Sequence, residues 1–213
     1  MKVGVVDYGV GNLGSVLRAL EELRVIPTLI TRAIDMHSMD CLILPGVGNF
    51  ADCAKLLSNG GWSAAIAEEV RGFGKPLLGV CVGMQLLATS SSEGLYNGVI
   101  NDTLGLGLIP GHVKSLRTIG CNLRIPHVGW NSVSPYPSEG LFYGIPPGTD
   151  FYFVHSYSFV PEDSNDILAT TDYGVPLVAA VRRGNVWGTQ FHPEKSSRAG
   201  LRLLRNFIEG SAC

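Results

Sequence analysis

The chain has 213 residues, a formal net charge of -2 and 46% hydrophobic residues, while only 16% are charged. This suits a single domain with a sizeable core, and the scattered basic residues indicate neither a nucleic-acid partner nor a membrane-surface partner. Its cysteines are odd in number and lack CxxC spacing: Cys41, Cys53, Cys81, Cys121 and Cys213. We therefore expect neither a disulfide framework nor a metal site. The N-terminus opens directly into a strand pattern and no apolar run could cross a membrane, so we expect a cytoplasmic protein.

The first half of the chain alternates strand and helix patterns. Short apolar runs predict buried strands at 2–7, 27–31, 41–44 and 77–80, the third of them ended by Pro45-Gly46. Apolar residues at helical spacing, or mixed with charged residues, predict helices at 12–24, 62–73 and 83–90. Fully apolar strands alternating with helices are typical of a parallel sheet covered on both faces. The pattern therefore predicts an α/β fold with a central, mostly parallel sheet flanked by helices.

The second half changes character. Residues 90–111 are rich in Ser, Gly and Asn and are expected to form a loop. Short β-rich segments follow, at 113–116, 127–130, 151–160, 167–172, 177–182 and 186–191. We expect them to extend the same sheet, partly antiparallel, before an amphipathic helix around 201–208. No repeat or linker interrupts the chain, so residues 1–213 are predicted to form one domain.

The stretch around Cys81 has the layout of a nucleophile elbow, a sharp strand-to-helix turn that exposes one reactive side chain. Gly79 and Gly83 lie two residues on either side, where a strained turn and closely packed backbones require small residues. A thiol placed there faces the N-terminus of the following helix, which favours the thiolate. Cys81 is therefore a candidate nucleophile, and the alternative is a buried core cysteine.

A second stretch, at the end of a late strand, offers a general base. His192 is followed two residues later by Glu194, and residues two apart in an extended segment point to the same face. Glu194 can then fix the tautomer of His192 while the other ring nitrogen faces a nucleophile, as in a catalytic triad. His192 is the one histidine with a carboxylate at this spacing at a strand end, and His127 and His155 remain ambiguous.

The turn Pro45-Gly46-Val47-Gly48 follows the third strand, one strand away from the elbow. Its glycines permit unusual backbone angles, so an N–H near Val47 or Gly48 can point into a site. With the N–H of Val82, directly after the thiol, it forms a candidate oxyanion hole. The alternative is an ordinary turn.

A glycine-rich turn after the first strand offers a different function. Gly9, Gly11 and Gly14 match the GxGxxG pattern of dinucleotide-binding folds. That function requires an acidic residue at the end of the second strand, and no acid occurs there before Asp35. We favour a tight strand-to-helix turn and keep a dinucleotide-dependent oxidoreductase as the alternative.

Taken together, the motifs at 79–85, 45–48 and 191–194 resemble those of class I glutamine amidotransferases, the triad family. Further stretches, at 126–131, 152–157 and 192–196, are most similar to the glutaminase subunits of imidazole glycerol phosphate synthase. The likeness runs nearly end to end. Val82 stands where leucine is more usual, which is harmless to a backbone N–H, and residues 91–109 and 115–124 look less typical.

The resemblance implies a flavodoxin-like glutamine amidotransferase domain with its elbow at the carboxyl edge of the sheet, working without cofactor or metal. Cys81 would attack the side-chain amide of L-glutamine, forming a glutamyl thioester and releasing ammonia, and water would then free glutamate. His192 would move protons and Glu194 would orient it, with Val47, Gly48 and Val82 at the oxyanion hole. The residues implied for glutamine binding are Gly46, Gln85, Glu93, His155, Ser156 and Tyr157.

The resemblance also implies a heterodimer. Ammonia is mostly protonated in neutral water and then cannot attack, so a partner must receive it along a sealed path. In this family the partner is a cyclase subunit, a (β/α)8 barrel that makes imidazole glycerol phosphate and AICAR in histidine biosynthesis. Asn12, Trp130, Asn131 and Lys195 would lie toward that interface.

Two further alternatives stay open at this point. A close relative of the family supplies ammonia for amidino-sugar synthesis on surface polysaccharides, and the sequence alone does not exclude it. A non-catalytic binding module is disfavoured because Cys81, His192 and Glu194 are all present.

Overall fold

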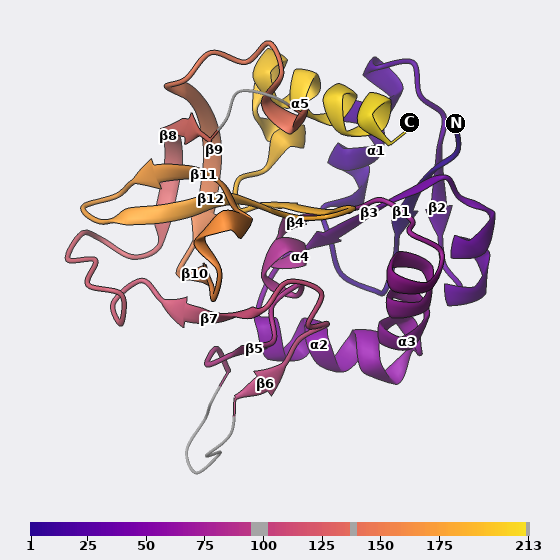
Figure 1. Cartoon of the computed structure of the whole chain (residues 1–213), viewed down its shortest axis with the longest axis horizontal. Helices are drawn as coiled ribbons and strands as arrows, with labels where there is room; N and C mark the ends of the chain where they lie inside the picture. Colours follow the sequence, from indigo (N-terminus) through magenta and orange to yellow (C-terminus); the bar gives the residue numbers. More distant parts are fainter. Residues whose placement is uncertain (95–101, 137–139, 212–213) are drawn as a thin grey trace.

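The computed structural model describes residues 1–94, 102–136 and 140–211, and within them the main feature is a nine-stranded sheet (Figure 1). Its strand order is β2-β1-β3-β4-β13-β12-β11-β8-β9. The parallel strands are β1 (Val3–Val6), β2 (Pro27–Ile30), β3 (Cys41–Gly46), β4 (Leu77–Cys81) and β13 (Val186–Thr189). The antiparallel strands are β8 (His127–Pro135), β9 (Thr149–His155), β11 (Ile167–Asp172) and β12 (Pro176–Arg183).

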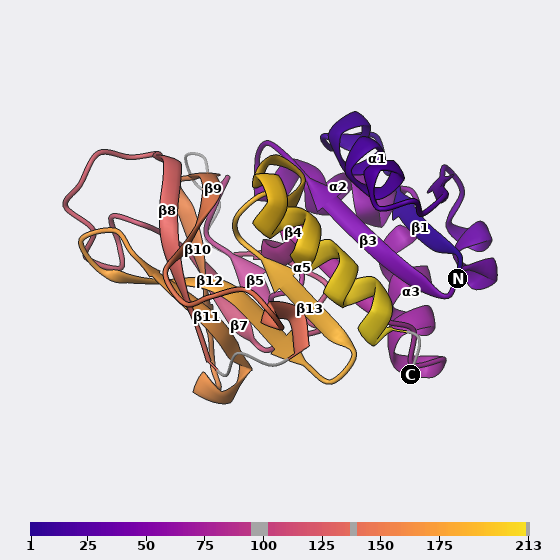
Figure 2. The same ribbon diagram turned by 90° about the horizontal axis from the view of Figure 1, so that it is seen from above.

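Helices cover both faces of the parallel half. On one face lie α1 (Leu13–Glu22) and α5 (Ser197–Gly210), and Figure 2 shows α5 lying over the strands and running roughly along them. On the other face lie α2 (Phe50–Asn59) and α3 (Trp62–Ala67), the latter continued by a π-helical turn, η2 (Glu68–Gly72). The residues of β1, β3 and β4 are all buried, as strands between two helical layers must be. The predicted α/β fold is confirmed, and its sheet is mixed.

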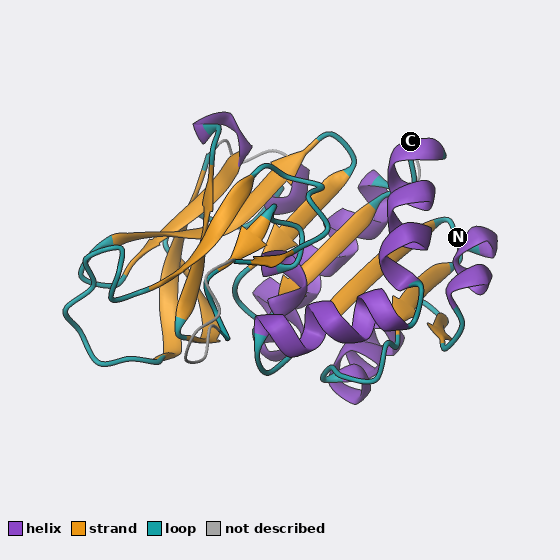
Figure 3. Ribbon diagram, turned by 90° about the horizontal axis from the view of Figure 1, so that it is seen from below, coloured by secondary structure: helices purple, strands orange, loops and turns teal. Residues whose placement is uncertain are grey.

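Figure 3 shows that the helices gather over the parallel strands, while loops and strands make up most of the antiparallel half. A second sheet lies beneath that half, in the order β10-β7-β5-β6. Its strands are β10 (Tyr157–Pro161), β7 (Gly111–Ser115), β5 (Ser90–Ser91) and β6 (Thr103–Leu104). The prediction that all late strands extend one sheet is therefore wrong, as is the prediction of a loop throughout 90–111, of which 95–101 lie outside the described residues.

The predicted strand 151–160 divides at Ser156, because β9 pairs with β8 in the large sheet while β10 pairs with β7 in the small one. Val113 and Phe159, on β7 and β10, are fully buried in the main core. The same core thus accepts one face of each sheet, and the chain changes sheet at a single residue.

Three further expectations are corrected. The strand β3 continues through Pro45-Gly46 instead of ending before it. The helix α2 was not predicted, although the Asn49 side chain accepts hydrogen bonds from two backbone N–H groups at its start and caps it. The helix after the elbow, α4 (Val82–Gln85), has a single turn, because the carbonyls of residues 86–89 accept hydrogen bonds from the backbone of 105–109.

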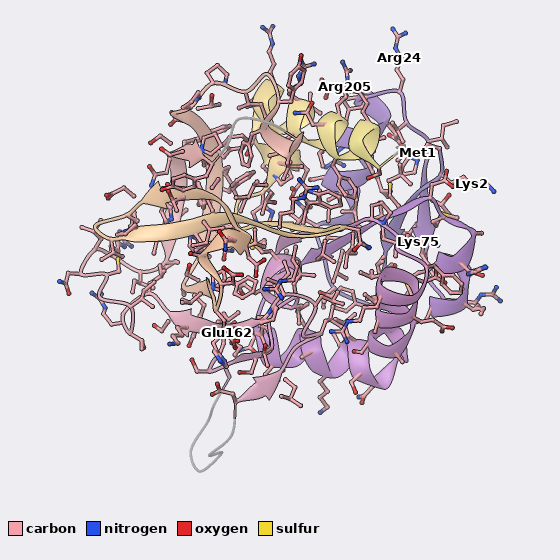
Figure 4. All side chains as sticks on the ribbon, viewed as in Figure 1. Met1, Lys2, Arg24, Lys75, Glu162 and Arg205 are labelled. Carbon is pink, nitrogen blue, oxygen red and sulfur yellow. The ribbon has the colours of Figure 1, made fainter. Side chains whose placement is uncertain are left out.

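Lys75, labelled in Figure 4, forms a buried ion pair with Glu69, their nitrogen and oxygen 2.7 Å apart. The Lys75 ammonium also donates to the backbone carbonyls of Met36 and His37, so its charge is satisfied without solvent. In the part of the chain that the structure describes, none of the helices has the length and apolarity that a membrane crossing needs.

Candidate active site

A cavity of about 320 Å³ lies at the carboxyl ends of β3, β4 and β13, a volume that suits a small molecule. Its walls come from both sheets and from the connecting turns. The lining residues are Val47, Gly48, Cys81, Val82, Gln85, Glu93, Pro126, Val154, His155, Ser156, Tyr157 and His192. In an open α/β sheet this carboxyl edge is where ligands usually bind.

Cys81 ends β4 with φ 57° and ψ -112°, a backbone conformation that residues other than glycine rarely adopt. The two flanking glycines are required by close backbone packing. A Cβ on Gly79 would lie 2.5 Å from the carbonyl oxygen of Gly83, and one on Gly83 would collide with the carbonyl oxygen of Leu44. The strained elbow is therefore present, but α4 is so short that its dipole adds less at the thiol than we expected.

His192 and Glu194 are in contact, with 2.7 Å between Nδ1 and Oε1, and both side chains are buried. The expected reason for this contact is wrong: Glu194 lies in a 3₁₀ turn, η5 (Pro193–Lys195), and not in an extended segment. The turn is held in place by Ser196, whose hydroxyl donates to the carbonyl of His192 and accepts from the N–H of Tyr152. Ser196 thus joins the backbone of this turn to β9.

The charge of His192 follows from its neighbours. Burial opposes the protonated ring, but side-chain hydrogen bonds with Cys81 and Glu194 outweigh burial and raise the pKa of His192 to about 9. The ring is then an imidazolium at neutral pH, next to a sulfur whose other polar neighbours, Val154 O and Gln190 Nε2, are each 3.9 Å away. Such a pair can add a thiolate to a carbonyl and protonate the leaving nitrogen.

Val47, Gly48 and Val82 all line the cavity beside Cys81, where the oxyanion hole was expected. Gly48 has φ 95°, a conformation that favours glycine. The carbonyl of Val47 accepts a hydrogen bond from the Cys53 thiol at 3.4 Å, so α2 holds part of this loop.

Gly46, expected at the glutamine site, does not line the cavity. It pairs with Cys81 at the end of β3, and a Cβ there would lie 2.6 Å from the nitrogen of Gly83. Its absence of a side chain therefore serves the packing of the elbow.

The two polar side chains expected to bind glutamine both line the cavity and both make hydrogen bonds within the protein. Gln85 donates to the carbonyl of Tyr157 at 3.1 Å and to the side-chain oxygen of Gln190 at 2.9 Å. Glu93 accepts from the N–H of Phe50 at 2.9 Å, at the start of α2. Burial raises the pKa of Glu93, although the hydrogen bond from Phe50 opposes the shift. The remaining expected residues, 155–157, line the cavity at the junction of β9 and β10.

The residues expected at a partner interface do not all share one surface. Trp130 is 53% exposed and packs edge-on against Tyr152, whose ring also lies under the ammonium of Lys195 at 5.7 Å. Asn12 precedes α1, which packs against the η5 turn that carries Lys195. Asn131 follows Trp130 in β8 and turns the other way, where it donates to the carbonyl of Asp172.

Residues that the sequence did not single out also form this site. Gln190 bridges Gln85 and Cys81, and its position two residues before His192 could have indicated it. Pro126 and Val154 line the wall with no sequence signal that we can identify. Across 1–94, 102–136 and 140–211, no cluster of three or more His, Cys, Asp or Glu could hold a metal ion.

The glycines of the GxGxxG match lie elsewhere. Gly9, Gly11 and Gly14 are not among the residues that line the cavity: Gly9 and Gly11 lie in the turn between β1 and α1, and Gly14 lies in the first turn of α1. A Cβ on Gly11 would meet the side chain of Pro45 at 3.5 Å, which agrees with a tight turn beside the neighbouring loop.

Comparison with known proteins places this geometry in context. The model of the family "Glutamine amidotransferase class-I" matches residues 4–210. The chain is 46% identical to imidazole glycerol phosphate synthase subunit HisH of Moorella thermoacetica, over 97% of this chain and 94% of that protein. It is 45% identical to the subunit of the same name from Rhodospirillum rubrum, with 98% of both chains covered. A crystal structure of a glutamine amidotransferase shares the fold with TM-score 0.75 at 24% identity, covering 99% of both chains.

Proposed function

Since the chain belongs to the class I glutamine amidotransferase family, we propose that it is the glutaminase subunit of imidazole glycerol phosphate synthase, one domain over residues 1–213. It hydrolyses L-glutamine to glutamate and ammonia. The observation that carries this proposal is the strained Cys81 elbow, which opens into a cavity beside the buried His192–Glu194 pair. Relatives that match over nearly the full length, at 45% and 46% identity, support a role in histidine biosynthesis over one in amidino-sugar synthesis.

The reaction proceeds in two halves. The Cys81 thiolate attacks the amide carbon, and the N–H groups of Val47 or Gly48 and of Val82 stabilise the developing oxyanion. The His192 imidazolium gives its proton to the departing nitrogen, so ammonia leaves and a thioester remains. His192 then takes a proton from water, which attacks the thioester and releases glutamate and the thiolate.

The partner is a cyclase subunit with a (β/α)8 barrel, in a heterodimer within the cytoplasm. The surface that suits it is the outer face of the β8–β9 hairpin, where Val128 and Trp130 are 55% and 53% exposed. Val154 joins this face to the cavity, because it is exposed, lines the cavity wall and has its carbonyl oxygen 3.9 Å from Cys81 Sγ. The path for ammonia from Cys81 to the outer face of β8 and β9 is therefore short.

Replacing the thiol tests the assignment. In the complex of this chain with the cyclase subunit, we expect Cys81→Ala to abolish glutamine-dependent product formation while synthesis from ammonium salts continues. The amide cannot be cleaved without the nucleophile, whereas the cyclase reaction needs only ammonia. Both rates are measured with the acceptor nucleotide present.

The matched control is Cys41→Ala, since Cys41 is a buried cysteine at the start of β3, at the opposite end from the cavity. This variant should keep its glutamine-dependent rate. Near-normal glutamine hydrolysis by Cys81→Ala would remove Cys81 as the nucleophile, and failure of the native complex with both nitrogen sources would remove the proposed pathway.

A further inference from the structure

Two histidines stand one behind the other at the back of the cavity. His155, on β9, lines the wall, and His127 is its direct partner on β8. His155 Nδ1 lies 2.8 Å from the carbonyl oxygen of Tyr157, and His155 Nε2 lies 2.9 Å from His127 Nδ1. His127 Nε2 lies 3.3 Å from the side-chain nitrogen of Asn131. These four residues form an unbroken chain of hydrogen bonds from β8 to the cavity wall.

The residues at the two ends of this hydrogen-bond chain, Asn131 and Tyr157, fix which atom donates and which accepts in each bond. The amide of Asn131 cannot be reversed, because its Nδ2 also donates to the Asp172 carbonyl at 2.7 Å and its oxygen accepts from the N–H of Ser132 at 2.9 Å. Asn131 therefore donates to His127. The carbonyl of Tyr157 can only accept. It follows that both rings carry their proton on Nδ1 and accept at Nε2.

We propose that His127 and Asn131 are positioning residues of the glutamine pocket, which hold His155 and the Tyr157 carbonyl through this one-directional chain of hydrogen bonds. That the ligand is glutamine rests on the proposed function, whereas the chain of hydrogen bonds does not depend on it. Neither His127 nor Asn131 lines the cavity, so both act through His155.

The chain of hydrogen bonds also keeps the rings of His127 and His155 neutral. A proton added to His155 Nε2 would face the N–H of His127 across 2.9 Å, and both rings would lose their hydrogen bond. Burial lowers the pKa of His155 to about 3 and that of His127 to about 4. The cavity thus holds one cationic ring, His192, and the opposite wall adds no second positive charge.

The Tyr157 carbonyl is the point at which the chain meets the pocket. It accepts from His155 at 2.8 Å and from Gln85 at 3.1 Å, so two lining side chains are oriented by one oxygen. Losing the donor behind His155 frees that ring to turn and changes the wall that faces glutamine. Cys81 and Glu194 take no part in this chain of hydrogen bonds. Loss of the donor behind His155 should therefore change the affinity for glutamine more than the turnover rate.

Two substitutions of His127 separate its hydrogen bond from its packing, because the ring is stacked between Phe153 at 4.8 Å and Tyr173 at 4.0 Å. His127→Phe keeps the stacked ring and loses the donor. His127→Asn loses the ring and can place an amide N–H where Nδ1 lies. In the complex with the cyclase subunit and acceptor nucleotide, we expect His127→Phe to raise KM for glutamine roughly tenfold with kcat nearly unchanged, and His127→Asn to stay near the native KM.

Any other pattern overturns the proposal, whether KM rises in both variants, in neither, or only in His127→Asn. A second measurement needs no substitution: ¹⁵N NMR of the histidine rings in the native chain should find both His127 and His155 protonated at Nδ1, at neutral pH. A proton on Nε2 of either ring would overturn the chain of hydrogen bonds. This readout does not depend on activity, so an inactive native complex would contradict the proposed function alone.

Discussion

At the scale of single residues, the central feature is a histidine whose charge is set by two neighbours. The Cys81 thiol and the Glu194 carboxylate each raise the pKa of His192, against the effect of burial. The resting site then holds a sulfur nucleophile and a proton donor at neutral pH, before any substrate arrives. Glutamine therefore meets a proton donor that is already in place.

Glu194→Gln tests this balance. We expect the pKa of His192 to fall from about 9, because a neutral amide stabilises the imidazolium less than a carboxylate does. The measurement is an NMR titration of the ring, with the exposed His37 as an internal reference. An unchanged His192 pKa would mean that Glu194 does not share the charge.

The same pKa has a consequence for stability, with a definite sign. A group whose pKa is raised by folding stabilises the fold fully below its unfolded value, about 6.5 for histidine. That contribution is lost as the pH rises through about 9. The free energy of unfolding of Glu194→Gln should therefore differ from the native value most near pH 6 and least above pH 9.

The three residues proposed as the triad could be singled out from the sequence because their patterns are local. Cys81 lies between its two glycines, and His192 is two residues from Glu194. The structure places them together, but by a 3₁₀ turn that the sequence pattern did not indicate. Asn131 was expected at an interface. It instead contacts His127, four residues away on the same strand, and the carbonyl of Asp172 at the end of β11, a neighbour that no local pattern encodes.

At the scale of elements, we expect the loop between β3 and α2 to control whether the site is active. An oxyanion hole needs an N–H aimed at the developing charge, and losing one such donor reduces the rate roughly a hundred- to a thousandfold. The loop is exposed at Val47 and Gly48, and its Val47 carbonyl is held by the Cys53 thiol. A peptide in such a loop can take two orientations of similar energy.

We therefore expect the isolated chain to hydrolyse glutamine slowly and to be strongly activated by the cyclase subunit with its nucleotide bound. Contact with the partner has only to supply the few kcal/mol that reorient one peptide. Glutaminase turnover is measured for the chain alone, for the complex, and for the complex with acceptor nucleotide. Equal glutaminase rates in these three samples would show that the loop is fixed in its active form. The assignment of Cys81, His192 and Glu194 would not be affected by that result.

The elements themselves were predictable where periodicity was strong. The buried strands of the parallel half match apolar runs within a few residues, because strands covered on both faces have no polar side. Helix α2 escaped prediction although Asn49 caps its first turn. The helix after the elbow ended early because the segment 105–109 takes its carbonyls as partners, a contact that only the folded chain reveals.

At the scale of the whole molecule, the cavity lies where two sheets meet. Its walls include Cys81 and His192 from the carboxyl edge of the large sheet. From the small sheet they include Tyr157, the first residue of β10, and Glu93, which follows β5. Alternation of strand and helix predicted the large sheet's parallel half. It could not predict which later strands would leave it, because β9 and β10 are continuous in sequence and separate at Ser156.

Because the cavity wall comes from both sheets, which separate at Ser156, we expect bound glutamine to hold the two sheets together more firmly than their shared core does alone. A ligand touching both walls lowers the free energy of the closed state alone, by about 2.7 kcal/mol at a concentration of 100 times Kd. In the Cys81→Ala chain, which cannot consume it, glutamine should slow amide hydrogen exchange throughout β7 and β10, while β2 at the far edge changes little. Protection confined to the turns around residue 81 would mean that the two sheets already open as one cooperative unit.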